Sequence, residues 1–225
     1  MARRQRSGRA WRGWAGVIAV LAWMVGPGAA PAAARYMTGA ALLDWCRDDG
    51  STFCPGYLAA LADYQSTLQV LDVDTPRFCL PSNVKLRELR TVVLDQLSTL
   101  PPDQLRAVAA ALMIPQLARR FPADAGGGCA ARAAAYVDGD ALIEWCRDDT
   151  ARLCSGYIAA LVDYQDELVR AGAGVRRFCL PEDTSLDALV RLSLKGLQAN
   201  PASERRKLAD SLVIPLLYRT FPCNQ

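Results

Sequence analysis

The stretch Gly56–Gln65, GYLAALADYQ, recurs one hundred residues later as Gly156–Gln165, GYIAALVDYQ. Large apolar residues follow each other here at intervals of four, three and four positions, which in the first stretch are Tyr57, Leu61, Tyr64 and Leu68. This spacing places them on one face of an α-helix, whereas a half-buried strand would alternate apolar and polar residues. The pattern therefore predicts a helix that begins near Cys54 and a second, equivalent helix that begins near Cys154.

The repeat extends well beyond these two helices. Residues 36–122 align with residues 136–222 without a gap, and 38 of the 87 aligned pairs are identical. An identity this high over the whole length indicates that one domain was duplicated. We assign residues 35–122 to the first module and residues 136–225 to the second, and we interpret the Ala/Gly stretch 123–135 as a linker.

Helical signals account for the rest of each module. A short first helix is expected after Thr38 or Asp138, residue types that cap helix N-termini, and its tryptophan is expected in the core. Leucines at helical spacing predict a third helix. A fourth helix is expected to begin after Leu100-Pro101 or Asn200-Pro201 and to run to Phe121 or Phe221. The sequence predicts an all-α protein with two tandem four-helix modules. The residues that carry these signals are Trp45, Trp145, Leu86, Leu97, Leu186, Leu197, Pro101, Pro201, Pro115 and Pro215.

The N-terminus has the pattern of an export signal. Five arginines precede an apolar run from Trp14 to Val25, and small residues follow as far as Ala34. Such a run is too short to span a bilayer comfortably but is typical of a secretory signal peptide. We therefore expect residues 1–34 to be a signal peptide. The adjacent pair Arg3-Arg4 leaves the twin-arginine route open beside the general secretory route.

Removal of this segment changes the charge of the chain. The whole sequence has 26 Lys and Arg against 23 Asp and Glu, but the five arginines of residues 1–34 leave with the signal. The remaining 21 basic residues give the mature chain a net charge of about −2, which argues against a nucleic-acid partner. No later segment approaches eighteen consecutive apolar residues, so the mature chain is not expected to insert into a membrane.

Eight cysteines in an exported chain indicate a disulfide framework. Four cysteines in a module admit three pairings, and spacing favours a short bridge between the first two of each module. The remaining cysteine of the second module would then pair across its last helix. Ala123 replaces the matching cysteine of the first module, so Cys129 is expected to act in its place. The preferred pairs are Cys46–Cys54, Cys79–Cys129, Cys146–Cys154 and Cys179–Cys223.

The sequence offers little for catalysis. It contains no histidine, which excludes the commonest general base and zinc ligand and all Ser-His or Cys-His nucleophile pairs. Asp63 and Asp163 lie beside tyrosines on the aromatic helices, and we interpret them as carboxylates that hydrogen-bond a neighbouring helix. We therefore predict no catalytic, metal or cofactor-binding residues.

The order of these motifs resembles one known family. Each copy has G-x-x-L-x-x-W-C, then C-x-G-Y, an aspartate six residues after that tyrosine, F-C-L-P, a leucine-patterned helix, and L-P or N-P. The second copy also ends in F-P-C. This order is similar to that of the resistance-associated-protein/Tai immunity family of Gram-negative bacteria. The sequence departs from the family pattern at Ala60 and Ala160, where glycine is frequent, and at Glu88 and Ala188, where glutamine is frequent.

The resemblance implies a function that composition alone does not. Members of that family are small periplasmic helical proteins, and the characterised ones neutralise peptidoglycan-amidase toxins delivered by type VI secretion. It implies that this chain is periplasmic and binds a protein, with a secreted amidase toxin as the expected partner. The alternative is a periplasmic structural or adaptor module that uses the same fold for an unrelated complex. An enzyme is the third possibility and has no supporting motif.

Two further expectations concern assembly and the partner surface. Because single-module relatives can form homodimers, the two copies are expected to reproduce that pair within one monomeric chain. From Gln69 to Pro76 against Val169 to Arg176, all eight aligned pairs differ. Neutral drift of a connecting loop explains this, but so does divergence of two partner-binding loops. On the second reading the binding residues are Asp72 and Asp74 in the first copy and Arg170 and Arg176 in the second.

Overall fold

The structure is a computed structural model, and it describes residues 36–70, 78–122, 136–147 and 152–223. The predicted signal peptide, the linker 123–135 and Asp72 and Asp74 all lie outside the described residues. The residues described in both copies belong to one compact unit. No described helix is both long enough and apolar enough to span a membrane.

Helices dominate both copies, as the sequence predicts, and the described residues contain no β-strand. The first copy consists of α1 (Gly39–Arg47), α2 (Phe53–Val70), α3 (Leu86–Leu97), the short 3₁₀ helix η1 (Gln104–Arg106) and α4 (Ala109–Arg120). The second copy consists of α5 (Gly139–Arg147), α6 (Leu153–Arg170), α7 (Leu186–Gln198), the single-turn α8 (Ala202–Arg205) and α9 (Ala209–Thr220). The predicted caps are present, since the side chains of Thr38 and Asp138 accept the backbone N–H groups of Ala41 and Ala141.

The predicted fourth helix is wrong in one respect. It does not run unbroken from its first proline, because η1 and α4 are separated by extended backbone, with ψ of 161° at Ala107 and 132° at Val108. A two-residue antiparallel bridge explains the break. Gly39 donates to the carbonyl of Ala107, and Ala109 donates to the carbonyl of Met37, both at 2.9 Å. The same bridge joins Asp138 and Leu208 in the second copy. Pro115 and Pro215 lie inside α4 and α9 as expected.

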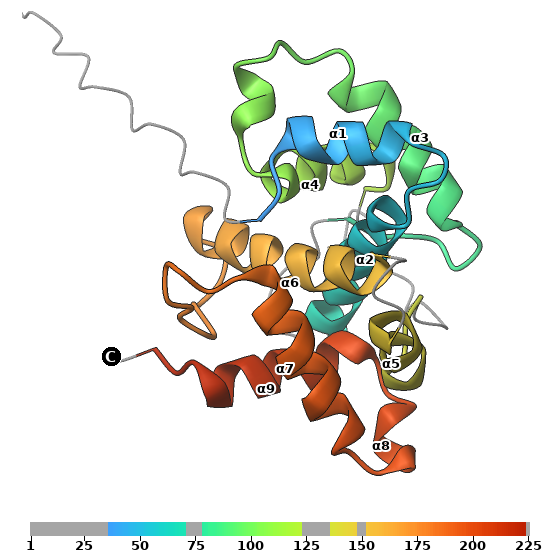
Figure 1. Cartoon of the computed structure of the whole chain (residues 1–225). Coiled ribbons are helices and arrows are strands. Elements are labelled where there is room, and N and C mark those ends of the chain that lie inside the picture. The colour runs from blue at the N-terminus through green and yellow to red at the C-terminus, as the bar shows by residue number, and fades with distance from the viewer. Residues whose placement is uncertain (1–35, 71–77, 123–135, 148–151, 224–225) are drawn as a thin grey trace, which may run out of the picture. The chain divides into compact units, whose positions relative to one another are not determined.

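The two copies are packed through their longest helices. In Figure 1, α2 and α6 cross at the centre, with α1, α3 and α4 on one side and α5, α7, α8 and α9 on the other. The final helices complete the junction reciprocally, because α4 of the first copy packs on α6 and α9 of the second copy packs on α2. Each long helix is therefore buried by elements of both copies.

Glycine permits the close crossing of α2 and α6. A Cβ atom added to Gly56 would lie 2.1 Å from the carbonyl oxygen of Leu153, and one added to Gly156 would lie 2.2 Å from that of Phe53. Backbone atoms cannot move aside as a flexible side chain could, so any side chain here would force the helices apart. The glycine of the C-x-G-Y motif is thus required by contact with the other copy.

Aromatic residues fill the rest of this junction. The rings of Tyr64 and Tyr164 meet edge to face at 5.2 Å between centroids, a favourable geometry for two aromatic rings. Each hydroxyl donates to a glutamine of the opposite copy, Tyr64 to Gln165 and Tyr164 to Gln65. The apolar stripe that predicts these helices from sequence is therefore the surface through which the copies meet.

Trp45 and Trp145 are not in the deepest part of the core, contrary to the prediction. Both are only partly buried and pack against its edge. Trp45 stacks on Phe53, and the guanidinium of Arg152 from the other copy lies 5.0 Å above its ring. The core itself is formed by the tyrosines of α2 and α6 and by the aliphatic residues of the surrounding helices.

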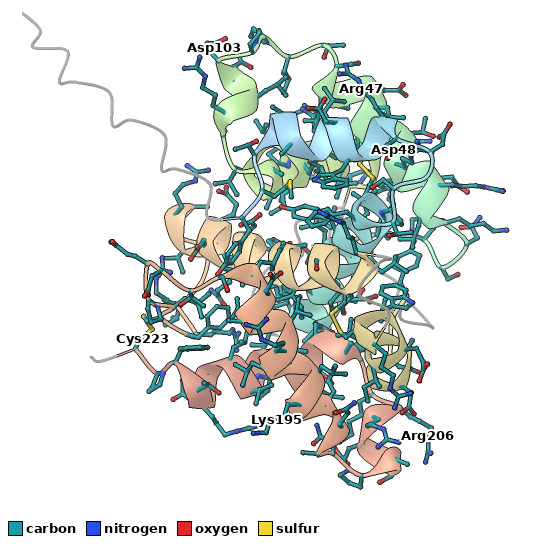
Figure 2. All side chains as sticks on the ribbon, viewed as in Figure 1. Arg47, Asp48, Asp103, Lys195, Arg206 and Cys223 are labelled. Carbon is teal, nitrogen blue, oxygen red and sulfur yellow. A yellow bond between two sulfur atoms is a disulfide. The ribbon has the colours of Figure 1, made fainter. Side chains whose placement is uncertain are left out.

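Disulfides join the ends of helices within each copy. Cys46–Cys54 and Cys146–Cys154 each link the end of a first helix to the start of a long helix, and Cys179–Cys223 links the F-C-L-P segment to the chain after α9. Figure 2 shows Cys223 near the C-terminus, beyond α9. Cys79 is also disulfide-bonded, and its predicted partner, Cys129, lies outside the described residues.

Candidate functional site

Two buried carboxylates hold the copies together. Asp63, on α2, accepts hydrogen bonds from the backbone N–H groups of Tyr136 and Val137 at 2.8 and 3.0 Å, and from the hydroxyl of Tyr157 at 3.3 Å. All three donors belong to the second copy. Each aspartate of the pair therefore anchors the entry to the first helix of the opposite copy, since Asp163 repeats the pattern in the other direction.

Asp163, on α6, accepts a hydrogen bond from the hydroxyl of Tyr57 at 3.1 Å, while its other oxygen, Oδ1, has no hydrogen-bond partner. Burial raises the pKa of its carboxyl group to about 7, and the Tyr57 hydroxyl and the nearby backbone N–H groups of Tyr36 and Met37 oppose that rise. Burial by both copies also raises the pKa of the Tyr57 hydroxyl. The sequence correctly predicts a structural carboxylate here, but the helix it binds lies in the other copy.

The residues predicted to bind a partner are only partly within the described structure. Arg176 pairs with Asp166 at 2.6 Å, and Arg170 pairs with Glu167 through two hydrogen bonds of 2.6 and 2.7 Å. The side chain of Arg170 remains 57% exposed and that of Arg176 40% exposed. Both guanidinium groups therefore lie at the surface, next to the C-terminal end of α6, and each is held there by an acidic residue of that helix.

A cavity of about 470 Å³ lies between α2 of the first copy and α9 of the second. Its walls are mainly apolar and include Leu68, Leu208, Ile214 and Pro215. Its volume is within the range of small-molecule sites. Figure 1 shows that α9 belongs to the side of the structure opposite the first-copy helices α1, α3 and α4, so the cavity exists only because the copies are packed together.

Polar groups without partners line this cavity. Asp210 is fully buried, and neither of its carboxylate oxygens forms a hydrogen bond with any described residue. The hydroxyl of Thr67 and the backbone N–H groups of Ser211 and Asp210 lie close enough to lower the pKa of Asp210 somewhat, but none of them adopts hydrogen-bond geometry with its carboxylate. The Thr67 hydroxyl is also left without a partner. Burial dominates and raises the pKa of Asp210 to about 6.

Sequence reasoning misses this cavity because its two walls come from different copies. A signal was nevertheless present in the repeat. The first copy has Ala110 at the position equivalent to Asp210, in a helix whose other buried positions are apolar in both copies. A charged residue that appears at a buried position in only one of two repeats is an indication of a specialised site.

The described residues contain no group of three or more acidic, histidine or cysteine side chains that could hold a metal ion. Among the exposed charges, Figure 2 places Asp103 and Arg206 at the edges of the first and second copies, in the segments that precede the last helix of each. Arg206 has an arginine, Arg106, at its equivalent position. The second segment is nevertheless the more basic, because residues 201–207 carry Glu204, Arg205, Arg206 and Lys207, and residues 101–107 carry only Asp103 and Arg106.

The similarity of this chain to known proteins is at the level of a family. No curated protein and no solved structure matches the chain. A family model described as Rap1a immunity proteins matches it twice, over residues 38–123 and 138–223. These two matches cover both copies and most of the sequence. The chain therefore belongs to the Rap1a immunity protein family, of which it carries two tandem copies.

Proposed function

We propose that this chain is an exported, periplasmic binding protein that neutralises a secreted peptidoglycan-amidase toxin delivered by type VI secretion. The observation that carries the proposal is the presence of two immunity-protein copies, which together account for most of the chain. Immunity proteins act by binding a toxin, so a protein partner follows from the family. The amidase target, the secretion route and the compartment are our inferences from the sequence motifs.

The disulfides support an oxidising compartment. Three disulfide bridges link described residues, and Cys79 is one cysteine of a further bridge. Such bridges form and persist outside the cytoplasm, which is consistent with the signal-like N-terminus. A toxin that attacks the cell wall acts in the same compartment, so an immunity protein would meet it there.

The packing of the copies supports a rigid binding protein. Buried carboxylates that accept hydrogen bonds from the opposite copy fix each first helix, so surface loops are presented on a firm base. A rigid surface loses less entropy on binding than a flexible one. We place the toxin-binding surface at the loops that follow α2 and α6, where Arg170 and Arg176 are exposed.

The proposal is tested by protection and by direct binding. Cells that export a peptidoglycan amidase encoded beside this gene are expected to lyse, and co-expression of the whole chain is expected to protect them. A chain without residues 1–34 is the matched control and is expected not to protect, because it stays in the cytoplasm. Failure of the purified, oxidised chain to bind or inhibit that amidase would contradict the proposal.

The binding surface is tested separately. Replacement of Arg170 and Arg176 by serine is expected to weaken toxin binding by at least about tenfold if they form charged contacts. The control is replacement of Arg191, an exposed arginine of α7, by serine. Equal affinity of both variants, with unchanged circular dichroism, would exclude the loop after α6 as the binding surface.

A further inference from the structure

The cavity between α2 and α9 contains two opposite charges that do not neutralise each other. Asp210 is fully buried in the wall, and the partly buried Arg177 also lines the cavity. No described residue forms an ion pair or hydrogen bond with either side chain. The burial of an unpaired charge is costly, so such an arrangement needs a reason.

The other polar residues that line the cavity do not neutralise Asp210 or Arg177. Lys207 lines the cavity but its ammonium group is paired with Glu204 at 2.6 Å. Ser211 donates its hydroxyl hydrogen to the carbonyl of Leu208. Asp210 and Arg177 therefore remain as the charged residues of the lining that have no partner among the described residues, and the rest of the lining is mainly apolar.

The first copy shows that the fold does not need these polar groups. It has Ala107 just before its last helix, and Ala110 and Ala111 within that helix, at the positions of Lys207, Asp210 and Ser211. The backbone is the same in both copies here, since α4 and α9 have equivalent bounds and the same bridge to the first helix. Folding alone therefore does not explain the charged lining of the second copy.

We infer that this cavity binds a small zwitterionic ligand, an amino acid or short peptide whose amino group pairs with Asp210 and whose carboxylate pairs with Arg177. The apolar stem between those groups contacts Leu68, Leu208 and Ile214. Thr67 supplies an additional oxygen for the amino group. An ammonium group that reaches Asp210 offers charge-assisted hydrogen bonds to its carboxylate, and a carboxylate matches the planar fork of a guanidinium. This inference does not depend on the toxin-binding function.

The test is a titration of the whole oxidised chain with a series of ω-amino acids, from glycine to 6-aminohexanoate, followed by the backbone amide NMR signals of Thr67, Leu68 and Ser211. The series is used because the separation of the two charges sets the stem length that fits. At least one member is expected to bind with a dissociation constant on the order of millimolar. The butylammonium ion and valerate, which carry only one of the two charges, are expected to bind at least about tenfold more weakly.

Matched variants assign the charges. Asp210→Asn is expected to weaken binding of the best zwitterion by about tenfold or more and to leave the binding of valerate unchanged. Arg177→Gln is expected to weaken binding of the best zwitterion equally and to leave the binding of butylammonium unchanged. Glu182→Gln, an exposed carboxylate outside the cavity, is the control and is expected to bind as the parent chain does. Arg177 is half-exposed, so its variant remains informative even if Asp210→Asn fails to fold. The inference is overturned if no member of the series shifts these signals, or if Asp210→Asn and Arg177→Gln both bind like the parent.

Discussion

Asp163 shows how a single buried group sets the response of the junction to pH. It accepts a hydrogen bond from Tyr57 of the first copy, and burial together with the nearby Asp166 raises its pKa to about 7. In the unfolded chain the same group titrates near 3.8. Between these values the folded chain binds one more proton than the unfolded chain, so the free energy of unfolding falls as pH rises.

This sign leads to a prediction for Asp163→Asn. The parent chain is expected to lose stability from about pH 4 to about pH 7 and to change little above that. Asp210, whose pKa is raised to about 6, adds to the loss only in the lower part of this window. The variant is therefore expected to decline much less steeply than the parent between pH 6 and 7, where the end of the Asp210 titration is the only loss that remains to it from these two groups. Urea unfolding at a series of pH values measures this, with the exposed Asp95→Asn as control.

A second prediction at the scale of the residue is that substitution of Gly56 or Gly156 destabilises the fold. An alanine at either position brings a Cβ atom to about 2 Å from a backbone carbonyl oxygen of the other copy, so α2 and α6 must separate. We expect each substitution to lower the free energy of unfolding by about 1–3 kcal/mol or more. Gly50→Ala is the control, because there the nearest atom is a side-chain oxygen of Asp48 at 3.4 Å. An equal, small effect at all three glycines would contradict the close-crossing explanation.

At the scale of the element, the structure separates what is encoded locally from what is not. The start of α1 follows from the Thr38 cap, and α2 and α3 follow from apolar spacing. Both signals are local, and the sequence predicts these helices. The break before α4 depends on the pairing of residues 107–109 with residues 37–39, about seventy residues away, and no local signal marks it. The cavity is further removed, because Thr67 and Asp210 lie in different copies. Each lies in a helix that the sequence predicts, and only the difference between Asp210 and its counterpart Ala110 marks one of them as unusual.

The disulfides also act at this scale, and loop length distinguishes them. Cys46–Cys54 spans a sequence separation of 8 and Cys179–Cys223 one of 44. In the chain-entropy description the longer loop restricts the unfolded chain more, and the two bridges contribute about 2.5 and about 4 kcal/mol. Replacement of Cys179 and Cys223 by serine is therefore expected to cost about 1.5 kcal/mol more than replacement of Cys46 and Cys54. Chemical unfolding of the two double variants measures the difference, and a larger cost for the short bridge would contradict this reasoning.

At the scale of the whole molecule, the two copies behave as the halves of a dimer joined in one chain. The contacts are reciprocal: Asp63 binds the second copy and Asp163 binds the first, Tyr64 reaches Gln165 and Tyr164 reaches Gln65. Tyr36 donates to the carbonyl of Thr184, and Tyr136 donates to that of Val84. Each copy thus completes the core of the other, which distinguishes this arrangement from two domains on a tether.

The resulting prediction is that the covalent link between the copies is dispensable once the chain has folded. A protease site introduced among residues 130–135 allows the oxidised chain to be cut after purification. The halves are expected to co-elute as one particle in native size exclusion and to separate only in denaturant, because the buried surface of α2 and α6 remains covered. The uncut chain is expected to be monomeric by light scattering, since its self-complementary surface is already occupied. The Gly56→Ala, Gly156→Ala double variant, cut in the same way, is expected to fall apart under native conditions. Halves that separate without denaturant in the parent chain, or an uncut chain that forms a stable dimer, would show that the copies do not form a closed pair.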